Sequence, residues 1–327
     1  MSFTEALSAN LLSPPILFFA LGIIAALVKS DLRFPEQFYS ALTIYLLTAI
    51  GFKGGVAVSE AGFDRVWLPA LAGIALSTII PLWCYAVLRR PGGLPIADAA
   101  SIAAHFGSVS AVTFITAVNY LKQAGVPSEG YASAFLAVME SPAIIAAVLL
   151  ARKGSPETSH SSLKPALHDA FLGRSVILLI GGLLVGWISG PAGLRSAEGF
   201  FVSPFFGVIA LFLLEMGIVT GRRLGDLRRA GPFLLLFGIA APIINGCLGA
   251  VAGTAAGLSI GGSMLMATLA ASASYIAAPA AMRVAIPEAR PTLSLATALG
   301  IAFPFNISVG LPLYLELARR CHSLFHS

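Results

Sequence analysis

Two short segments of this sequence place hydroxyl-bearing side chains beside a helix-breaking residue inside apolar surroundings. The first is His105–Thr113, which contains Gly107, and the second is Ser272–Pro279. A helix broken at such a segment leaves main-chain N–H groups at a positive dipole end, which suits a small anion. Its freed carbonyls and its hydroxyls suit a hard cation such as Na⁺. Close helix packing by small residues is the alternative for each segment alone, but the pair favours a binding site.

Two acidic residues also stand within apolar stretches. Glu140 precedes Ser141 and Pro142, and Glu215 follows two leucines. An isolated carboxylate is costly to bury in a membrane, so such acids face a cavity, a partner or an ion. We predict a coupling-ion or proton role for Glu140. For Glu215 a structural pairing is an equal hypothesis, with Lys53 as its candidate partner.

Two more polar residues are accessory candidates. His105 could donate to an anion or carry protons, although a hydrogen-bonded core histidine is the more ordinary interpretation. Asn306, in the run Phe303–Asn306, either hydrogen-bonds across helices or lines the site. The sequence does not separate these two roles of Asn306.

The amino-acid composition indicates the class of protein in which these residues occur. The chain has 327 residues, of which 57% are hydrophobic and only 11% are charged. Soluble domains carry about 25% charged residues, so an ordinary soluble enzyme is excluded. A net charge of +5 in so apolar a chain indicates basic loops at a membrane rather than a nucleic-acid surface. The three cysteines have neither disulfide-framework nor zinc-site spacing. The sequence is that of an integral membrane protein.

Apolar stretches long enough to cross a bilayer recur along the whole chain. A spanning helix needs roughly 20 apolar residues. Ten stretches between charged or Pro/Gly breaks approach this length, and they predict ten transmembrane helices: 14–28, 38–58, 66–88, 97–121, 131–151, 171–188, 204–221, 232–258, 263–284 and 293–317. The two broken segments then fall in the fourth and ninth spans.

The basic residues predict the orientation. Loops that follow odd-numbered spans hold fourteen of the twenty Lys and Arg residues, and the opposite side holds six. Positive loops stay in the cytoplasm, so both termini should lie outside an inner (plasma) membrane.

The halves of the chain predict an internal repeat. A hydrophilic linker at 153–169 separates a first five-helix repeat at 1–152 from a second at 170–327. Five is odd, so the second repeat is inverted in the membrane. Gly51 and Gly55 align with Gly217 and Gly221, and prolines recur at matching places. Chance agreement in apolar sequence is the alternative. Inverted repeats are typical of secondary transporters, whose sites lie at the repeat interface. In the linker, His160 and His168 are expected to be solvated.

The same segments resemble the sodium-dependent bicarbonate transporter family, essentially from end to end. The matching pieces are 50–55, 106–110, 139–143, 270–279, 283–287 and the last span. The resemblance implies broken fourth and ninth helices, a mobile core and a gate domain, and elevator-type transport. It also implies a homotrimer in the lipid bilayer and a small PII-like regulatory protein on the cytoplasmic side, with no cofactor other than Na⁺ as the coupling ion.

The resemblance also implies roles for particular residues. Bicarbonate would be bound by Gly107, Ser108, Ser110, Ser272 and Ser274, and Na⁺ by Glu140, Ser141, Thr113 and Tyr275, with His105 and Asn306 as accessories. The cyanobacterial relatives carry Asp where this chain has Tyr275 and where it has Glu140. A neutral hydroxyl at Tyr275 predicts a weaker cation site and a changed choice of anion.

Other functions have weaker support in the sequence. A cation- or proton-coupled carrier of another small anion, using Glu140 or His105, is the nearest alternative. An intramembrane serine hydrolase using Ser108 or Ser110 lacks the Gly-x-Ser-x-Gly pattern. A phosphate-binding Gly-x-x-x-x-Gly-Lys-[Ser/Thr] loop is also missing, which disfavours ATP-driven pumping, and a passive channel fits inverted halves poorly.

Overall fold

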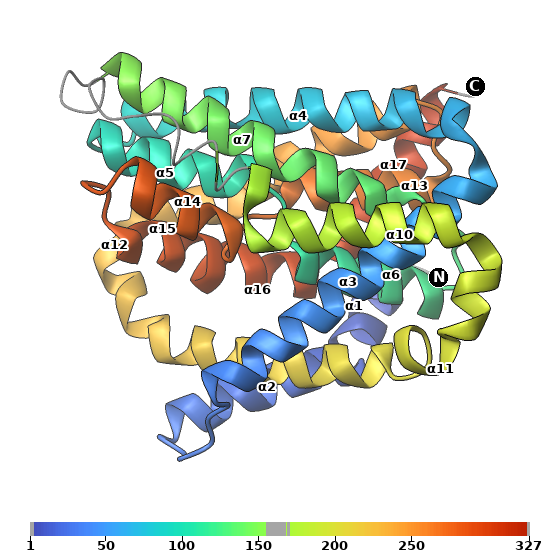
Figure 1. The fold of residues 1–327 in the computed structure, drawn as a ribbon. Coiled ribbons are helices and arrows are strands. Elements are labelled where there is room, and N and C mark those ends of the chain that lie inside the picture. The colour runs from blue at the N-terminus through green and yellow to red at the C-terminus, as the bar shows by residue number, and fades with distance from the viewer. Residues whose placement is uncertain (1–2, 155–167, 169–170, 326–327) are drawn as a thin grey trace.

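The computed structural model describes residues 3–154, 168 and 171–325, and every regular element in these residues is a helix (Figure 1). The elements are α1 (Phe3–Leu11), α2 (Pro14–Leu27), α3 (Glu36–Ala61), α4 (Phe63–Arg89), α5 (Ile96–Gly107), α6 (Ala111–Gln123), α7 (Ala132–Gly154), α10 (Arg174–Ser196), α11 (Glu198–Phe201), α12 (Phe205–Ala255), α13 (Ile260–Ala271), α14 (Ala277–Ala285), α15 (Pro291–Leu295), η1 (Ala296–Ala302), α16 (Phe303–Phe305), η2 (Asn306–Gly310) and α17 (Leu311–Phe325). Most of the predicted linker at 153–169, including His160, lies outside the described residues.

The long apolar helices make this a multi-pass membrane protein. Among the described residues, eight helices are long and apolar enough to cross a bilayer, or nine if the bent pair α1 and α2 forms one span. The residues of the predicted ninth span form two short helices, α13 and α14, on either side of the second predicted break, and neither helix is long enough to count as a span. The count of ten spans therefore stays a prediction. The first and last parts of the described chain lie at the same end of the helical bundle (Figure 1).

Two helices run on through Gly–Pro steps that lie at or near the boundaries of the predicted spans. α10 continues past Gly190 to Ser196, and α12 passes through Gly231. Both glycines have positive φ, 61° and 75°, a conformation that side chains disfavour. The following Pro191 and Pro232 cannot donate the next helical hydrogen bond. Each step therefore redirects its helix, and the predicted seventh and eighth spans are joined by helix rather than by a loop.

Glycines let α3 and α10 cross with their backbones in contact. A Cβ atom added to Gly55 would overlap the carbonyl oxygen of Leu183, and one added to Gly186 would overlap that of Phe52. Gly51 and Gly182 face each other in the same crossing. Small residues at a crossing allow this approach in membranes, where van der Waals contact rather than burial from water drives helix association.

A second glycine crossing joins α2 to the first part of α12. Gly22 lies against the backbone of Leu214 and Gly217, and Gly217 in turn lies against the carbonyl of Phe19. Gly221 continues the same contact line one turn further on, against Ile23 and Ala26. The glycines that align between the two halves of the sequence thus sit in crossings of the same kind.

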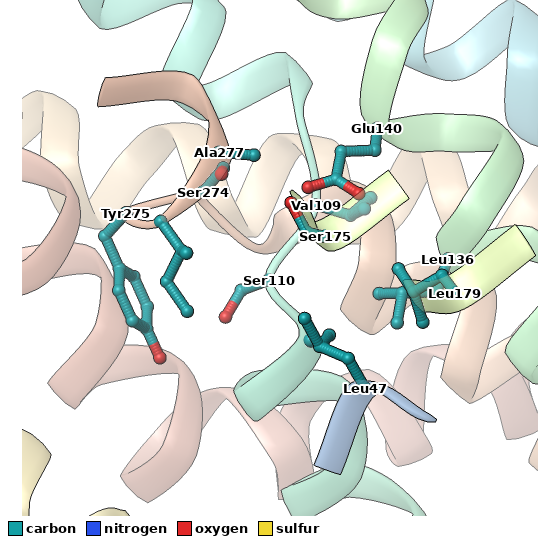
Figure 2. Close-up of a pocket in the computed structure, with 12 residues that line it drawn as sticks. Leu47, Val109, Ser110, Leu136, Glu140, Ser175, Leu179, Ser274, Tyr275 and Ala277 are labelled. Carbon is teal, nitrogen blue, oxygen red and sulfur yellow. The ribbon is translucent and has the colours of Figure 1, made fainter. Parts of the chain in front are cut away.

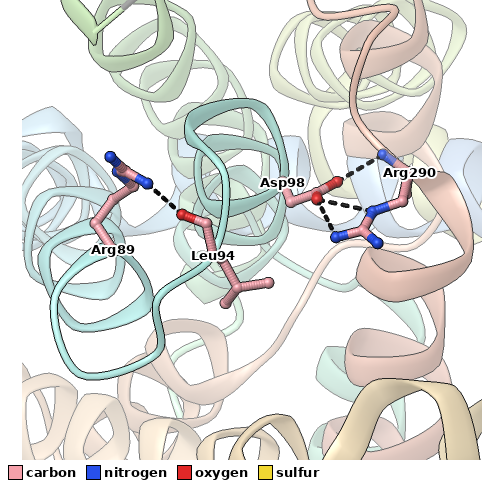
Figure 3. A network of polar contacts seen from close by, with 4 residues as sticks. All are labelled: Arg89, Leu94, Asp98 and Arg290. Carbon is pink, nitrogen blue, oxygen red and sulfur yellow. Dashed lines mark hydrogen bonds and ion pairs between the residues drawn. The ribbon is translucent and has the colours of Figure 1, made fainter.

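A bidentate ion pair ties the start of α5 to the turn before α15 (Figure 3). Asp98 accepts from Arg290 Nε at 2.9 Å, from Nη2 at 2.6 Å and from the main-chain N–H at 2.8 Å. The Asp98 side chain is only 4% exposed, whereas that of Arg290 is 61% exposed. Asp98 raises the pKa of Arg290 further above its ordinary value through this hydrogen bond and charge. Nearby, Arg89 donates to the carbonyl of Leu94, which closes the turn between α4 and α5 (Figure 3).

Candidate functional site

The first predicted segment is a break between two helices. α5 ends at Gly107, Ser108 and Ser110 are extended, and α6 begins at Ala111. The Ser110 hydroxyl accepts from the N–H of Thr113 at 3.3 Å and from the Thr113 hydroxyl at 3.0 Å. Ser110 is therefore the N-cap of α6, a role for which serine suits because its short side chain reaches the free N–H groups of the first turn.

The second predicted segment is a break of the same type. α13 ends at Ala271, Ser272 is extended, and α14 begins at Ala277. The Ser274 hydroxyl accepts from the N–H of Ala278 at 3.2 Å, inside the first turn of α14. Pro279 lies in that same turn, where its missing N–H costs little because the first helical N–H groups have no intrahelical partner.

The two breaks cross and are joined by hydrogen bonds between them. The N–H of Ser274 donates to the carbonyl of His105 at 2.8 Å. The N–H of Ser110 donates to the hydroxyl of Ser272 at 2.9 Å. Non-helical backbone at membrane depth persists only where it is buried in protein or lines a cavity. Each break therefore supplies a hydrogen-bond acceptor for a main-chain N–H group of the other. Two segments that are far apart in the sequence are held together in this way.

A small cavity of about 20 Å³ lies beside this crossing (Figure 2). Its polar lining comes from Ser110, Glu140, Ser175, Ser274 and Tyr275. The remaining lining is Leu47, Val109, Ala111, Leu136, Leu179, Ile276 and Ala277. Four residues predicted for the site thus meet around one space, two of them predicted for the anion (Ser110 and Ser274) and two for the coupling ion.

Two oxygen atoms at the cavity are buried without a hydrogen-bond partner among the described residues: Glu140 Oε2 and the Tyr275 hydroxyl. Glu140 supplies the only carboxylate of the described lining, and the Ser175 hydroxyl lies against it (Figure 2). Leaving such groups unpaired costs about 1–3 kcal/mol each, and more when the group is charged. The Tyr275 hydroxyl points away from Glu140 (Figure 2), so the small space lies beside the carboxylate alone. An unpaired carboxylate there fits a bare cation, or a proton with one water, as its partner.

The volume decides which predicted ligand this conformation accommodates. A cavity needs about 10–15 Å³ to hold one water molecule. The space beside Glu140 therefore accepts a single water or an ion of that size, and bicarbonate, with four heavy atoms, exceeds it. In this conformation the cavity matches the coupling ion better than the anion.

A larger vestibule of about 760 Å³ adjoins the cavity. The two spaces share Leu47, Ser175, Ile276 and Ala277 in their walls. The vestibule is also lined by Glu36, Gln37, Tyr39, Ser40, Thr43, Gly173, Arg174, Ala280 and Ala281. The shared walls place the vestibule directly beside the cavity.

Three of the predicted anion-binding residues support the breaks without lining the cavity. Gly107 packs against Pro81 and Ala143 so closely that a Cβ atom would overlap the proline ring. The Ser108 hydroxyl donates to the main-chain carbonyl of Glu140 at 3.2 Å. The Ser272 hydroxyl donates to the Leu269 carbonyl at 2.8 Å, besides accepting from Ser110.

Ser141 and the two accessory candidates lie away from the cavity. Ser141 faces a separate groove between α4, α7 and α10, on another side of α7 from Glu140. His105 Nδ1 lies 2.7 Å from the Ser101 carbonyl, and its Nε2 is buried without a partner among the described residues. Asn306 donates to the Ala271 carbonyl at 3.0 Å, and its own oxygen accepts from Tyr314 at 2.5 Å. Asn306 therefore holds the end of α13 in place.

The proposed partnership of Glu215 with Lys53 is wrong. No ion pair joins them in the described part of the chain, and the Lys53 ammonium lies 3.2 Å from the ring centroid of Phe205. A cation over an aromatic face is stabilised by the negative ring surface.

Sequence reasoning missed Ser175 and Leu47 as site residues. Ser175 lies in the first turn of α10 and Leu47 in the middle of α3, so neither belongs to a broken segment. The one local signal at Ser175 is a small polar residue between Arg174 and a long apolar run. Only the packing of α3 and α10 against the breaks places these residues at the cavity.

Comparison with known families agrees with this architecture. Residues 14–319 match the sequence model of the Na⁺-dependent bicarbonate transporter superfamily. The chain belongs to this superfamily. Its members are transporters and not enzymes, which removes the serine hydrolase hypothesis. A search of curated proteins found no match. The family points to transport of bicarbonate with sodium as the coupling ion.

Proposed function

We propose that this protein is a secondary active transporter that carries bicarbonate together with Na⁺ across the inner (plasma) membrane. The observation that carries the proposal is the cavity at the crossing of the two breaks. Its lining contains Glu140, whose carboxylate has an oxygen without a partner among the described residues, together with Ser110, Ser274 and Tyr275. Sodium prefers oxygen ligands, and Glu140 supplies the negative charge that a buried cation needs.

The anion site lies in the same crossing under this proposal. Ser108, Ser110, Ser272 and Ser274, together with Gly107, belong to the two extended segments. Main-chain N–H groups at the start of α6 and α14 favour negative charge. Because the cavity holds only about 20 Å³, the anion site forms when the breaks separate further from α3 and α10.

The transport mechanism is an elevator, in which a mobile core moves against a static gate. The gate comprises α2, α3, α10 and α12 before Gly231, held by the two glycine crossings. The core comprises α4–α7, the rest of α12, and α13–α17. The cavity lies on their boundary, since Leu47, Ser175 and Leu179 come from the gate and its other residues from the core. Inverted repeats at 1–152 and 170–327 account for the two similar crossings, each formed between one helix of either half.

The partners implied by the family resemblance belong to the same proposal. These are assembly as a homotrimer and regulation by a small PII-like protein on the cytoplasmic side. The proposal also keeps both termini outside, as the distribution of Lys and Arg among the loops predicts.

Proton coupling, or another small anion, is the second candidate function. One observation favours it: the described cavity lining has a single carboxylate, and Tyr275 contributes a neutral hydroxyl. A lone buried carboxyl group is a proton carrier when its charged form is not stabilised.

The experiment measures uptake of labelled bicarbonate into proteoliposomes. We expect uptake with external Na⁺ to exceed uptake with choline at least fivefold, because the coupling ion completes the Glu140 site. Equal uptake in the two salts overturns sodium symport. If a proton gradient then drives uptake in choline, proton coupling is the function instead.

A further inference from the structure

Of the cavity and the adjoining vestibule, only the vestibule is large enough to hold a hydrated anion. Its volume of about 760 Å³ compares with about 20 Å³ for the cavity behind it. Its walls come from the start of α3, the start of α10 and the helix α14. An anion that approaches the crossing from this face of the molecule would enter the vestibule first.

A fixed guanidinium lies in the vestibule wall. Arg174 Nη2 donates to the Ser40 carbonyl at 2.9 Å and also to the Ser40 hydroxyl, so α10 and α3 are bridged there. No other hydrogen bond or ion pair of Arg174 occurs among the described residues. Its Nε–H and Nη1–H groups are thus left to donate to a ligand, on a group whose position is already set.

The vestibule lining carries one basic and one acidic side chain, which are not paired with each other. Arg174 is the only Lys or Arg in the described lining, and Glu36 is its only acid. Glu36 forms no ion pair with Arg174 in the described structure. Tyr39, Ser40 and Thr43 add hydroxyl groups to the wall. The Thr43 hydroxyl donates to the Tyr39 carbonyl at 2.9 Å. The Ser40 hydroxyl accepts from Arg174, which leaves the Ser40 O–H as a donor beside the guanidinium.

We propose that Arg174 forms an anion-holding site in the vestibule, separate from the crossing, which takes a small planar oxyanion of the carboxylate or bicarbonate type. The inference rests on the proposed function and adds a second anion-binding site to it. A guanidinium donates two parallel N–H bonds to an O–C–O edge, whereas an ammonium acts as a point charge. The site therefore raises the local concentration of the anion on one side of the membrane only.

The test measures the KM for bicarbonate in vesicles of both orientations. Arg174→Gln should raise KM about tenfold on the side to which the vestibule opens, the effect of losing one charge-assisted contact, with little change in Vmax. Arg174→Lys should fall between that variant and the wild type, and Glu36→Gln should lower KM. The KM on the other side should stay unchanged in all three variants.

Arg222→Gln is the matched control. Arg222 is also an exposed arginine that donates to a main-chain carbonyl, that of Leu32 at 3.1 Å, but it does not line the vestibule. An unchanged KM for Arg174→Gln overturns the inference, as do equal shifts for Arg222→Gln or equal shifts on both sides. If the wild type takes up no bicarbonate, the proposed function fails. In that case the thermal stability of the purified protein, measured with and without bicarbonate or formate, tests the Arg174 site separately. The site is supported if the anions raise the Tm of the wild type and do not raise that of Arg174→Gln. It is refuted if they raise the Tm of both proteins equally, or do not raise that of the wild type.

Discussion

At the scale of single residues, the proposed site depends on a carboxylate and a hydroxyl that have no hydrogen-bond partner in the described part of the chain. Glu140 is 5% exposed, and its Oε2 lacks a partner among the described residues. Replacing Glu140 by Gln removes the charge and keeps the shape. We expect sodium-dependent bicarbonate uptake to fall roughly ten- to hundredfold, because contacts to charged groups contribute about 1.5–3 kcal/mol. Initial uptake rates across a sodium titration measure this loss.

Ser141→Ala is the control for that substitution. Ser141 is the next residue of α7, but it faces the groove toward α4 and α10 rather than the cavity. Its uptake should remain within about threefold of the wild type, the range of a modest hydrogen-bond change. If both variants lose uptake equally, the defect belongs to α7 as a whole and Glu140 has no specific role.

Which residues meet at the site could be predicted only in part. Gly107, Ser110, Ser274 and Pro279 carry local signals, because glycine, proline and capping serines interrupt helices wherever they occur. The bonds that join the breaks, such as Ser274 to His105, depend on packing between distant segments. Whether a buried serine lines a cavity or donates to a carbonyl, as Ser108 does, is decided by that packing as well.

At the scale of helices, two glycine crossings set how closely the proposed gate helices approach. Gly186→Ala would drive a methyl group into the Phe52 carbonyl, so α3 and α10 must separate. We expect a loss of about 1–3 kcal/mol in stability, the usual cost of overpacking. Thermal unfolding in detergent should show a lower Tm.

Gly181→Ala tests whether that loss comes from the crossing. Gly181 lies in the same helix, and a Cβ atom there would contact nothing within 4 Å. Alanine should leave the Tm unchanged or raise it slightly, because it favours a helix by about 1 kcal/mol over glycine. A Tm drop of equal size in both variants would mean that the close contact at Gly186 contributes nothing specific.

Helix boundaries followed the sequence less well than the breaks did. The charged residues at 222–226 predicted a loop, yet α12 runs through them, because a helix that leaves the apolar region can continue where its polar side chains reach water. The alignment of Gly51 and Gly55 with Gly217 and Gly221 was visible in the sequence. That each pair of glycines lies in a helix crossing could not be predicted, because it depends on which helix packs against them.

At the scale of the whole molecule, the elevator proposal requires the wall of the cavity to part during transport. Ser175 belongs to the proposed gate and Ala277 to the proposed core, and both line the cavity and the vestibule (Figure 2). Because the cavity is so small, cysteines at these two positions should be bridged by a mercuric ion, in a background where Cys84, Cys247 and Cys321 are replaced. Bridging should abolish uptake, and a dithiol should restore it, since a core tied to the gate cannot move.

A cross-link within the core separates this effect from general rigidity. The hydroxyls of Thr254 and Ser263 lie 3.3 Å apart, one on α12 after its kink and one on α13, both in the proposed core. Cysteines there should be bridged as readily, yet uptake should continue because a rigid core travels as one body. Each single-cysteine variant should transport with and without mercury. If protein shown by mass spectrometry to be bridged between positions 175 and 277 still accumulates bicarbonate at the unbridged rate, the two groups of helices do not move past each other, and the cavity must open by a local change in the breaks.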